Sequence, residues 1–283
     1  SSIDINFINN KKVIKSKINT AGISKYSEIK VISSLFGLNL GNIKNIELES
    51  DLETSVKLFL DDRFKVTDST FSINGKINGL NIEHKEIKNL KKFLPSYKSK
   101  FFLKDTKVNF NQDSNLKLFG LIKLNNKFED FSLSGRTGKN FNLSGKISLH
   151  DLSLKISSLN YLKEANDEAY IDFNINSNKF GYNINRLLYY SRKSKVEFDK
   201  IKLNRKLEIK DLRSIKVITF KNNLKNNDFH ISKHKTLKNT IFINGKLFDA
   251  EPLLKSLYKT GNKKILSKDF STEIKVNFDK TIT

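Results

Sequence analysis

One long stretch of this chain alternates regularly between apolar and polar residues, and this alternation constrains the fold more than any other feature. Across residues 116–159, apolar side chains recur at every second position, with turn-forming segments such as Asn125-Asn126 and 137–140 between the runs. A two-residue period is that of a β-strand with one buried face. Connections this short cannot cross over a sheet, so the strands must be antiparallel. We therefore predict a meander of about four hairpin-linked strands here.

Similar alternating segments occur along the rest of the chain, and few segments have a helical period. The further predicted strands are 3–8, 46–60, 71–77, 101–110, 170–175, 196–203, 215–220, 229–231, 241–247 and 274–278. The predicted helices are 24–36 with Gly37 after it, one capped by Asn81 and ended by Pro95, and one capped by Asp249, with Pro252 in its first turn and Gly261 at its end. The predicted fold class is mostly β: an elongated, curved antiparallel sheet, forming a β-groove or gutter, with a few short helices.

A short glycine-containing repeat favours a curved sheet. It occurs as FSINGKI, LKLFGLI, FSLSGRT, FNLSGKI and IFINGKL, and its glycines are Gly75, Gly120, Gly135, Gly145 and Gly245. Each glycine falls on the same face as the apolar residues, where it leaves room or permits a sharp bend. A β-bulge explains any single copy equally well. Their recurrence on one face favours a sheet that is curved along its length.

The sequence contains no recognisable catalytic or metal-binding motif. Cysteine is absent, which excludes disulfides, thiolate metal sites and cysteine nucleophiles. Motifs of the types G-x-S-x-G, G-x-x-x-x-G-K-[ST], G-x-G-x-x-G and H-E-x-x-H are also absent. His230 and His234 are four residues apart, but the segment is strand and turn, and Lys233 and Lys235 beside them repel cations. His84 is expected on a helix in solvent. We expect no enzyme activity, no metal and no cofactor.

The net charge of +22 attracts polyanions such as nucleic acid, anionic lipid headgroups or lipopolysaccharide. The lysines are spread along the chain, and the abundance of Lys, Asn and Ile also indicates a biased coding background. The strongest nucleic-acid candidates are Arg192, Lys193 and Lys195, which follow Tyr189-Tyr190. Residues 187–190 are equally well read as a buried strand or helix end. We expect no specific nucleic-acid site.

The two ends of the chain suggest a piece of a longer protein. The chain contains no Met, the start has no signal-peptide pattern, and no apolar run is long enough to cross a bilayer. The last alternating segment, STEIKVNFDKTIT, follows a helix and has no partner strand after it. We therefore expect a processed or excised product that is cut at both ends. The absence of cysteine is compatible with an oxidising compartment such as the periplasm.

Two segments resemble the AsmA-like envelope proteins of the YhdP and TamB type. In TIFINGKLFDAEPLLKSLYKTG, residues 240–261, an apolar strand with Gly245 leads to Asp249 and a helix containing Pro252, and STEIKVNFD follows. IEHKEIKNLKKFLP, residues 82–95, is similar to a short helix of that family that ends in Leu-Pro. The segment after it, SYKSKFFLKD, departs from the family in having no Trp.

The resemblance implies one continuous β-groove over residues 1–283 with a sub-boundary near 95–100. It implies a location in the periplasm of a Gram-negative bacterium, with an inner-membrane anchor in a segment missing from this chain. The concave apolar face would carry phospholipid acyl chains between inner and outer membrane, and the lysines would lie outside. The implied lining is Phe71, Ile73, Ile77, Leu118, Ile122, Phe131, Leu133, Phe141, Leu143, Ile147, Ile241, Ile243 and Leu247.

Two other interpretations remain open at this point. The same apolar face can be the closed core of a β-sandwich or β-solenoid interaction protein, such as an adhesin. The charge can instead serve a polyanion-binding protein, which would lose its ligand as salt rises.

Overall fold

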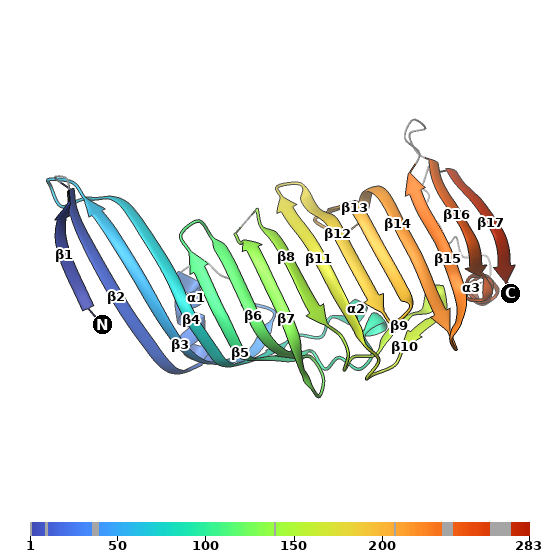
Figure 1. Ribbon diagram of the computed structural model, residues 1–283, viewed down its shortest axis with the longest axis horizontal. Helices are drawn as coiled ribbons and strands as arrows, with labels where there is room; N and C mark the ends of the chain where they lie inside the picture. The colour runs from blue at the N-terminus through green and yellow to red at the C-terminus, as the bar shows by residue number, and fades with distance from the viewer. Residues whose placement is uncertain are drawn as a thin grey trace. The chain divides into compact units, whose positions relative to one another are not determined.

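The structure, a computed structural model, describes residues 2–8, 11–35, 40–138, 140–206, 208–233, 240–260 and 273–283 (Figure 1). It divides into two compact units, the first made of residues 1–88 and 97–147 and the second of 89–96 and 148–283. Each unit is built on an open sheet, since the first and last of its strands are not paired with each other. The predicted fold class, mostly β with an open, curved antiparallel sheet and a few short helices, is confirmed.

In the first unit, consecutive strands pair in chain order and in antiparallel register. The strands are β1 (Ser2–Ile8), β2 (Lys11–Lys25), β3 (Ile43–Leu60), β4 (Val66–His84), β5 (Lys100–Asn111), β6 (Asn115–Lys123), β7 (Phe128–Arg136) and β8 (Asn142–Ser148). The predicted meander is confirmed from β6 to β8. The turn between β6 and β7 contains Asn125 and Asn126, as the sequence indicates.

The second unit departs from the prediction at its start. The strand expected at residues 152–156 does not join the main sheet; β9 (Leu154–Ile156), the 3-10 turn η1 (Ser157–Leu159) and β10 (Tyr161–Lys163) form a separate two-stranded hairpin. Leu152 and Leu154 are buried, so their alternation reflects burial in a covering layer. The main strands of the unit are β11 (Ala169–Asn178), β12 (Gly181–Ser191), β13 (Ser194–Asn204), β14 (Ile209–Lys221), β15 (Leu224–Lys233), β16 (Thr240–Asp249) and β17 (Glu273–Ile282).

The last strand is parallel to its neighbour. β17 pairs with β16 in parallel register, while the other described strand pairs are antiparallel. The helix α3 (Glu251–Thr260) lies between the two strands in sequence, and a parallel pair needs a crossover connection of this kind. Asp249 caps α3 as predicted, because its Oδ1 accepts a hydrogen bond from the Glu251 N–H at 3.2 Å, and Pro252 lies in the first turn. The predicted Gly261 lies outside the described residues.

Of the other two predicted helices, one is confirmed and one is much shorter than expected. Helix α1 (Tyr26–Leu35) matches the prediction, although Gly37 lies outside the described residues. Helix α2 (Lys88–Phe93) begins well after Asn81, which lies within β4 and caps no helix. Residues 81–84 continue the strand β4, so Asn81 does not act as a helix N-cap although its residue type favours that role. His84 is the last residue of that strand, and its Nε2 lies 2.6 Å from the Tyr97 hydroxyl.

Candidate functional site

Most of the predicted lining residues lie together on one face of the first unit. Leu133 lies opposite both Leu118 and Gly145, and Phe131 lies opposite Ile147. Directly opposed residues of adjacent strands project from the same face of a sheet. We call this surface the apolar face; its predicted members are Phe71, Ile73, Ile77, Leu118, Ile122, Phe131, Leu133, Leu143 and Ile147. Phe141 lies immediately before β8.

The structure adds apolar residues of β3 and β5 to this face. Leu103 lies opposite Leu80 and Ile122, and Phe110 lies opposite Ile73. The pairing of β5 with β6 shifts between Lys104 and Lys107, so the apolar residues before and after this bulge are out of step in the sequence. A sequence reading that allowed one β-bulge would have included both ends of β5. On β3, Ile46, Leu48, Leu52 and Val56 share the apolar face, with Ser50 and Thr54 between them.

The apolar face is packed at its centre and partly exposed elsewhere. Leu103, Ile122 and Phe131 form a buried cluster, against which Leu118 packs in part. Phe71 remains 38% exposed. Within this unit, the described residues form no second sheet over the face, and helix α1 packs against β2 and β3. Among the described residues of this unit, no second sheet therefore covers the apolar face.

Glycines of the repeat mark places where strands approach closely. A Cβ at Gly120 would lie 2.6 Å from both Cα and Oγ1 of Thr106, which belongs to the bulge of β5. A Cβ at Gly75 would collide with the backbone of β3, and one at Gly135 with the backbone of β8. Both of these glycines also have a positive φ. These contacts support the prediction of a bent sheet, and the space next to each glycine is filled by a neighbouring strand.

Three predicted lining residues, Ile241, Ile243 and Leu247, fall in the second unit. Ile241 and Ile243 alternate on one face of β16. Leu247 does not continue that alternation, because a bulge in the pairing of β15 with β16 lies between Gly245 and Leu247. The ring that continues the face is that of Phe248, whose centroid lies 5.7 Å from that of Phe229. The prediction for Leu247 is therefore wrong in register.

The β9–β10 hairpin covers the corresponding face of the second unit. The hydroxyls of Tyr161 on β10 and Tyr189 on β12 are 2.8 Å apart, and the two rings meet edge to face. Both tyrosines are buried, as are Val196 and Val217, which lie opposite each other beside Tyr189. The second unit thus has a closed core under the hairpin. This part of the chain agrees with the closed-core interpretation, although the covering layer is a hairpin and not a second large sheet.

A buried polar network fixes the hairpin to the sheet. Asn227 Nδ2 donates to the Leu159 carbonyl at 2.9 Å, and Asn226 Nδ2 donates to the same oxygen at 3.1 Å. Asn160 Nδ2 donates to Asp249 Oδ2 at 2.9 Å. Asp249 is only 3% exposed, so this carboxylate anchors the hairpin as well as capping α3. A buried network whose members are bonded favours one specific arrangement of the elements that it joins.

A buried lysine on β10 binds the segment that leads from β8 into the hairpin. Lys163 is 1% exposed, and its Nζ donates to the carbonyl oxygens of Leu149 at 2.6 Å, His150 at 2.7 Å and Leu152 at 2.6 Å. These bonds use all the donors of an ammonium group. The Lys163 ammonium therefore organises the turn between β8 and β9, a role that the sequence pattern did not indicate.

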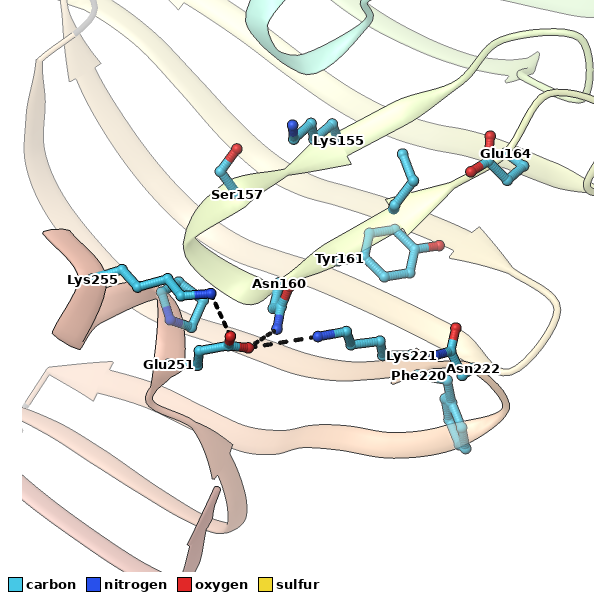
Figure 2. A pocket seen from close by; sticks show the side chains of 12 residues that line it. Lys155, Ser157, Asn160, Tyr161, Glu164, Phe220, Lys221, Asn222, Glu251 and Lys255 are labelled. Carbon is cyan, nitrogen blue, oxygen red and sulfur yellow. Dashed lines mark hydrogen bonds and ion pairs between the residues drawn. The ribbon is translucent and has the colours of Figure 1, made fainter. Parts of the chain in front are cut away.

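A cavity of about 710 Å³ lies between the hairpin, the end of β14 and the start of α3 (Figure 2). Glu251 lies at one end of it (Figure 2): it accepts hydrogen bonds from Lys255 and from Asn160 Nδ2 at 2.8 Å, and Lys221 Nζ lies 3.5 Å away. The hydrogen bond from Lys255 is the main reason why the pKa of Glu251 lies below its ordinary value. One carboxylate thus forms ion pairs with both lysines at this end of the cavity.

Of the histidine pair in the sequence, His230 alone lies within the described residues. His230 is exposed on β15 and lies opposite Lys216 and Asn244, while His234 lies outside the described residues. In the parts of the chain that the structure describes, no group of three or more His, Cys, Asp or Glu residues could hold a metal ion.

The basic segment after Tyr189-Tyr190 is taken up by structural contacts. Tyr189 lies in β12, so the strand interpretation of residues 187–190 is correct, and burial raises the pKa of its hydroxyl above the ordinary value. Arg192 forms an ion pair with Asp167 at 2.6 Å, and Lys195 forms one with Glu197 at 2.7 Å.

Across the described residues, no helix is both long enough and apolar enough to span a bilayer. Comparison of the chain with protein-family models, with curated proteins and with solved structures gives no match.

Proposed function

We propose that this chain is a non-enzymatic lipid-shielding module, which holds phospholipid acyl chains against the apolar face of its first unit. The observation that carries the proposal is that this face is apolar, partly exposed and, among the described residues of its unit, not covered by a second sheet. Soluble proteins rarely leave an apolar surface of this extent without an occupant. The resemblance to AsmA-like envelope proteins supports a periplasmic location between inner and outer membrane, with an anchor outside this chain.

An acyl chain suits the chemistry of this face. Most of its side chains are Leu, Ile, Val and Phe, although Thr106 and Glu129 also project from it. The backbone groups of its strands are used in the sheet, so recognition depends mainly on apolar area. Burial of each methylene contributes about 0.8 kcal/mol. Because that attraction has no direction, a bound chain can slide along the face while its headgroup stays in water. The proposal is therefore passive shielding, with no group on the face that would drive transfer.

The second unit limits the proposal. Its comparable face is occupied by the hairpin, which the Asn226, Asn227 and Asp249 contacts hold in place. We therefore assign acyl-chain binding to the first unit, and not to one continuous groove over the whole chain. Because the hairpin covers the apolar face of the second unit, a second candidate function is an interaction protein. In such a protein, another protein would cover the apolar face of the first unit.

Native mass spectrometry, with extraction and identification of co-purifying lipid, tests the proposal. The test variant is Leu118→Asp with Leu133→Asp, a directly opposed pair at the centre of the apolar face. The matched control is Ser132→Asp with Ser134→Asp, which adds the same charge on the other face of β7. Far-UV circular dichroism and thermal unfolding establish that each variant is folded.

We expect phospholipid to remain on the wild type and on the control at high salt, and to be lost from the test variant. Retention at high salt separates acyl-chain burial from binding of polyanions. A folded wild type that carries no lipid and takes up no fluorescent phospholipid would overturn the proposal and favour the protein-completed interaction module.

A further inference from the structure

The opposite face of the first unit carries a second surface, built from lysines and phenylalanines on β5, β6 and the start of β7. Phe102 lies opposite Lys123, Lys107 lies opposite Phe119, and Lys123 lies opposite Phe128. These side chains therefore project together, away from the apolar face. We call this surface the Lys–Phe face; its members are Lys100, Phe102, Lys104, Lys107, Lys117, Phe119, Lys123 and Phe128.

The ammonium groups of this face lie against its aromatic rings. Lys123 Nζ is 4.4 Å from the centroid of Phe102 and 5.0 Å from that of Phe128, and Lys107 Nζ is 5.4 Å from the centroid of Phe119. Phe119 is 52% exposed and Phe128 is 40% exposed. Cation–π contact keeps each charge next to an exposed apolar ring. A partner that binds this face would therefore contact ammonium groups and apolar rings side by side.

The charge of the face is not neutralised locally. Among the described residues, none of its lysines forms an ion pair, whereas the adjacent Lys76 is paired with Asp105 at 2.6 Å. Two acidic residues of the same side lie beside the face: Glu83 on β4 is opposite Lys100, and Asp130 on β7 is opposite Leu121. A further acidic group lies on β3, two strands away from β5 and thus roughly 10 Å from it. The members of this group are Glu47, Glu49, Asp51 and Glu53. The five lysines of the face outnumber the acidic residues beside it, so the surface has a net positive charge.

We propose that the Lys–Phe face docks on an anionic bilayer surface. Lysines next to exposed aromatic rings are the combination that binds the headgroup region: ammonium groups pair with lipid phosphates, and rings enter the interface. Single-stranded nucleic acid fits less well. Bases stack on free ring faces, and here ammonium groups lie over the rings. Moreover, β5 and β6 contain no Arg, the residue best suited to bidentate phosphate recognition.

This inference does not depend on the proposed function, because it concerns the other side of the sheet. The test is co-sedimentation of the full chain with vesicles of phosphatidylcholine alone and of phosphatidylcholine mixed with phosphatidylglycerol. The first variant is Lys104→Gln with Lys107→Gln and Lys123→Gln. Its control is Lys193→Gln with Lys200→Gln and Lys206→Gln, which removes the same charge from exposed positions of the second unit. A second variant, Phe119→Ser with Phe128→Ser, removes the rings at constant charge.

We expect the wild type to bind the anionic vesicles and to be released by salt. Loss of three interfacial lysines should lower the partition coefficient on the order of 100-fold, while the control should change it only a few-fold. The ring variant should bind more weakly than the wild type at the same salt concentration.

Equal losses for the two lysine variants would overturn the inference, since only total charge would then matter. Equal binding to neutral vesicles, or tighter binding to an oligothymidine strand than to anionic vesicles, would overturn it as well. The Leu118→Asp, Leu133→Asp variant should still dock on vesicles, so failure of acyl-chain binding and failure of docking give different results.

Discussion

Replacement of the buried Lys163 by Met tests whether its ammonium group organises the turn that leads into the hairpin. Met keeps an unbranched apolar side chain but removes the ammonium bonds to the carbonyls of Leu149, His150 and Leu152. The first two carbonyls keep a backbone N–H donor, whereas the Leu152 carbonyl loses the donor that Lys163 supplies. Each buried acceptor without a partner costs about 1–3 kcal/mol, and part of this is offset because the ammonium no longer has to be dehydrated. We expect a net local destabilisation of about 3 kcal/mol.

Hydrogen exchange measures this effect where it should occur. The Asn166 N–H donates to the His150 carbonyl at 2.8 Å, so its exchange reports opening of the turn. A loss of about 3 kcal/mol should accelerate this exchange on the order of 100-fold. The control is Lys155→Met, which removes an exposed lysine from the same hairpin and should change little. Protection of Asn166 at the wild-type level in Lys163→Met would refute the assigned role.

Two further predictions concern sheet packing and alkaline pH. Gly120→Ala should destabilise the first unit by about 2–3 kcal/mol, because the added Cβ would meet the backbone of Thr106. The control, Gly79→Ala, should change the stability by no more than about 0.5 kcal/mol, since its Cβ would meet only a side chain. Equal urea unfolding midpoints for the two variants would contradict this prediction. Burial favours the neutral form of Tyr189 in the folded state, so its stabilising contribution is complete below the ordinary pKa of 10.0 and is lost as pH rises above that value. The tyrosinate absorbance of Tyr189 should appear only with unfolding, and a Tyr189→Phe variant with an unchanged alkaline transition would contradict the assignment.

The regular part of the fold could be predicted because the alternation of apolar residues along a strand determines which face each residue occupies and thus the sheet register. Leu118, Leu133 and Ile147 were expected on one face, and direct pairing across β6, β7 and β8 places them there. The register failed where one extra residue enters a strand. The bulge before Leu247 transfers the role of this residue to Phe248, and no local property of the residues marks that position.

The hairpin could not be predicted because its determinants are distant in sequence. Leu152 and Leu154 alternate like residues of a main-sheet strand, and only the tertiary contacts show that they lie in a covering layer. Lys163 is a residue type that sequence reasoning places in water. Its burial depends on three carbonyls that point at one position, which is a property of the folded turn and not of composition.

The network that holds the hairpin also sets an order in which the chain can be completed. Strands that pair with their sequence neighbours need only short loops to close, so each can form as soon as its predecessor exists. The hairpin cannot close in this way, because Leu159 is bonded to Asn226 and Asn227, and Asn160 to Asp249, across 67 to 89 residues. During synthesis from the N-terminus, we expect the second unit to remain without its cover until β16 has been made. For that interval, the second unit presents the same kind of partly exposed apolar surface to its surroundings as the first unit.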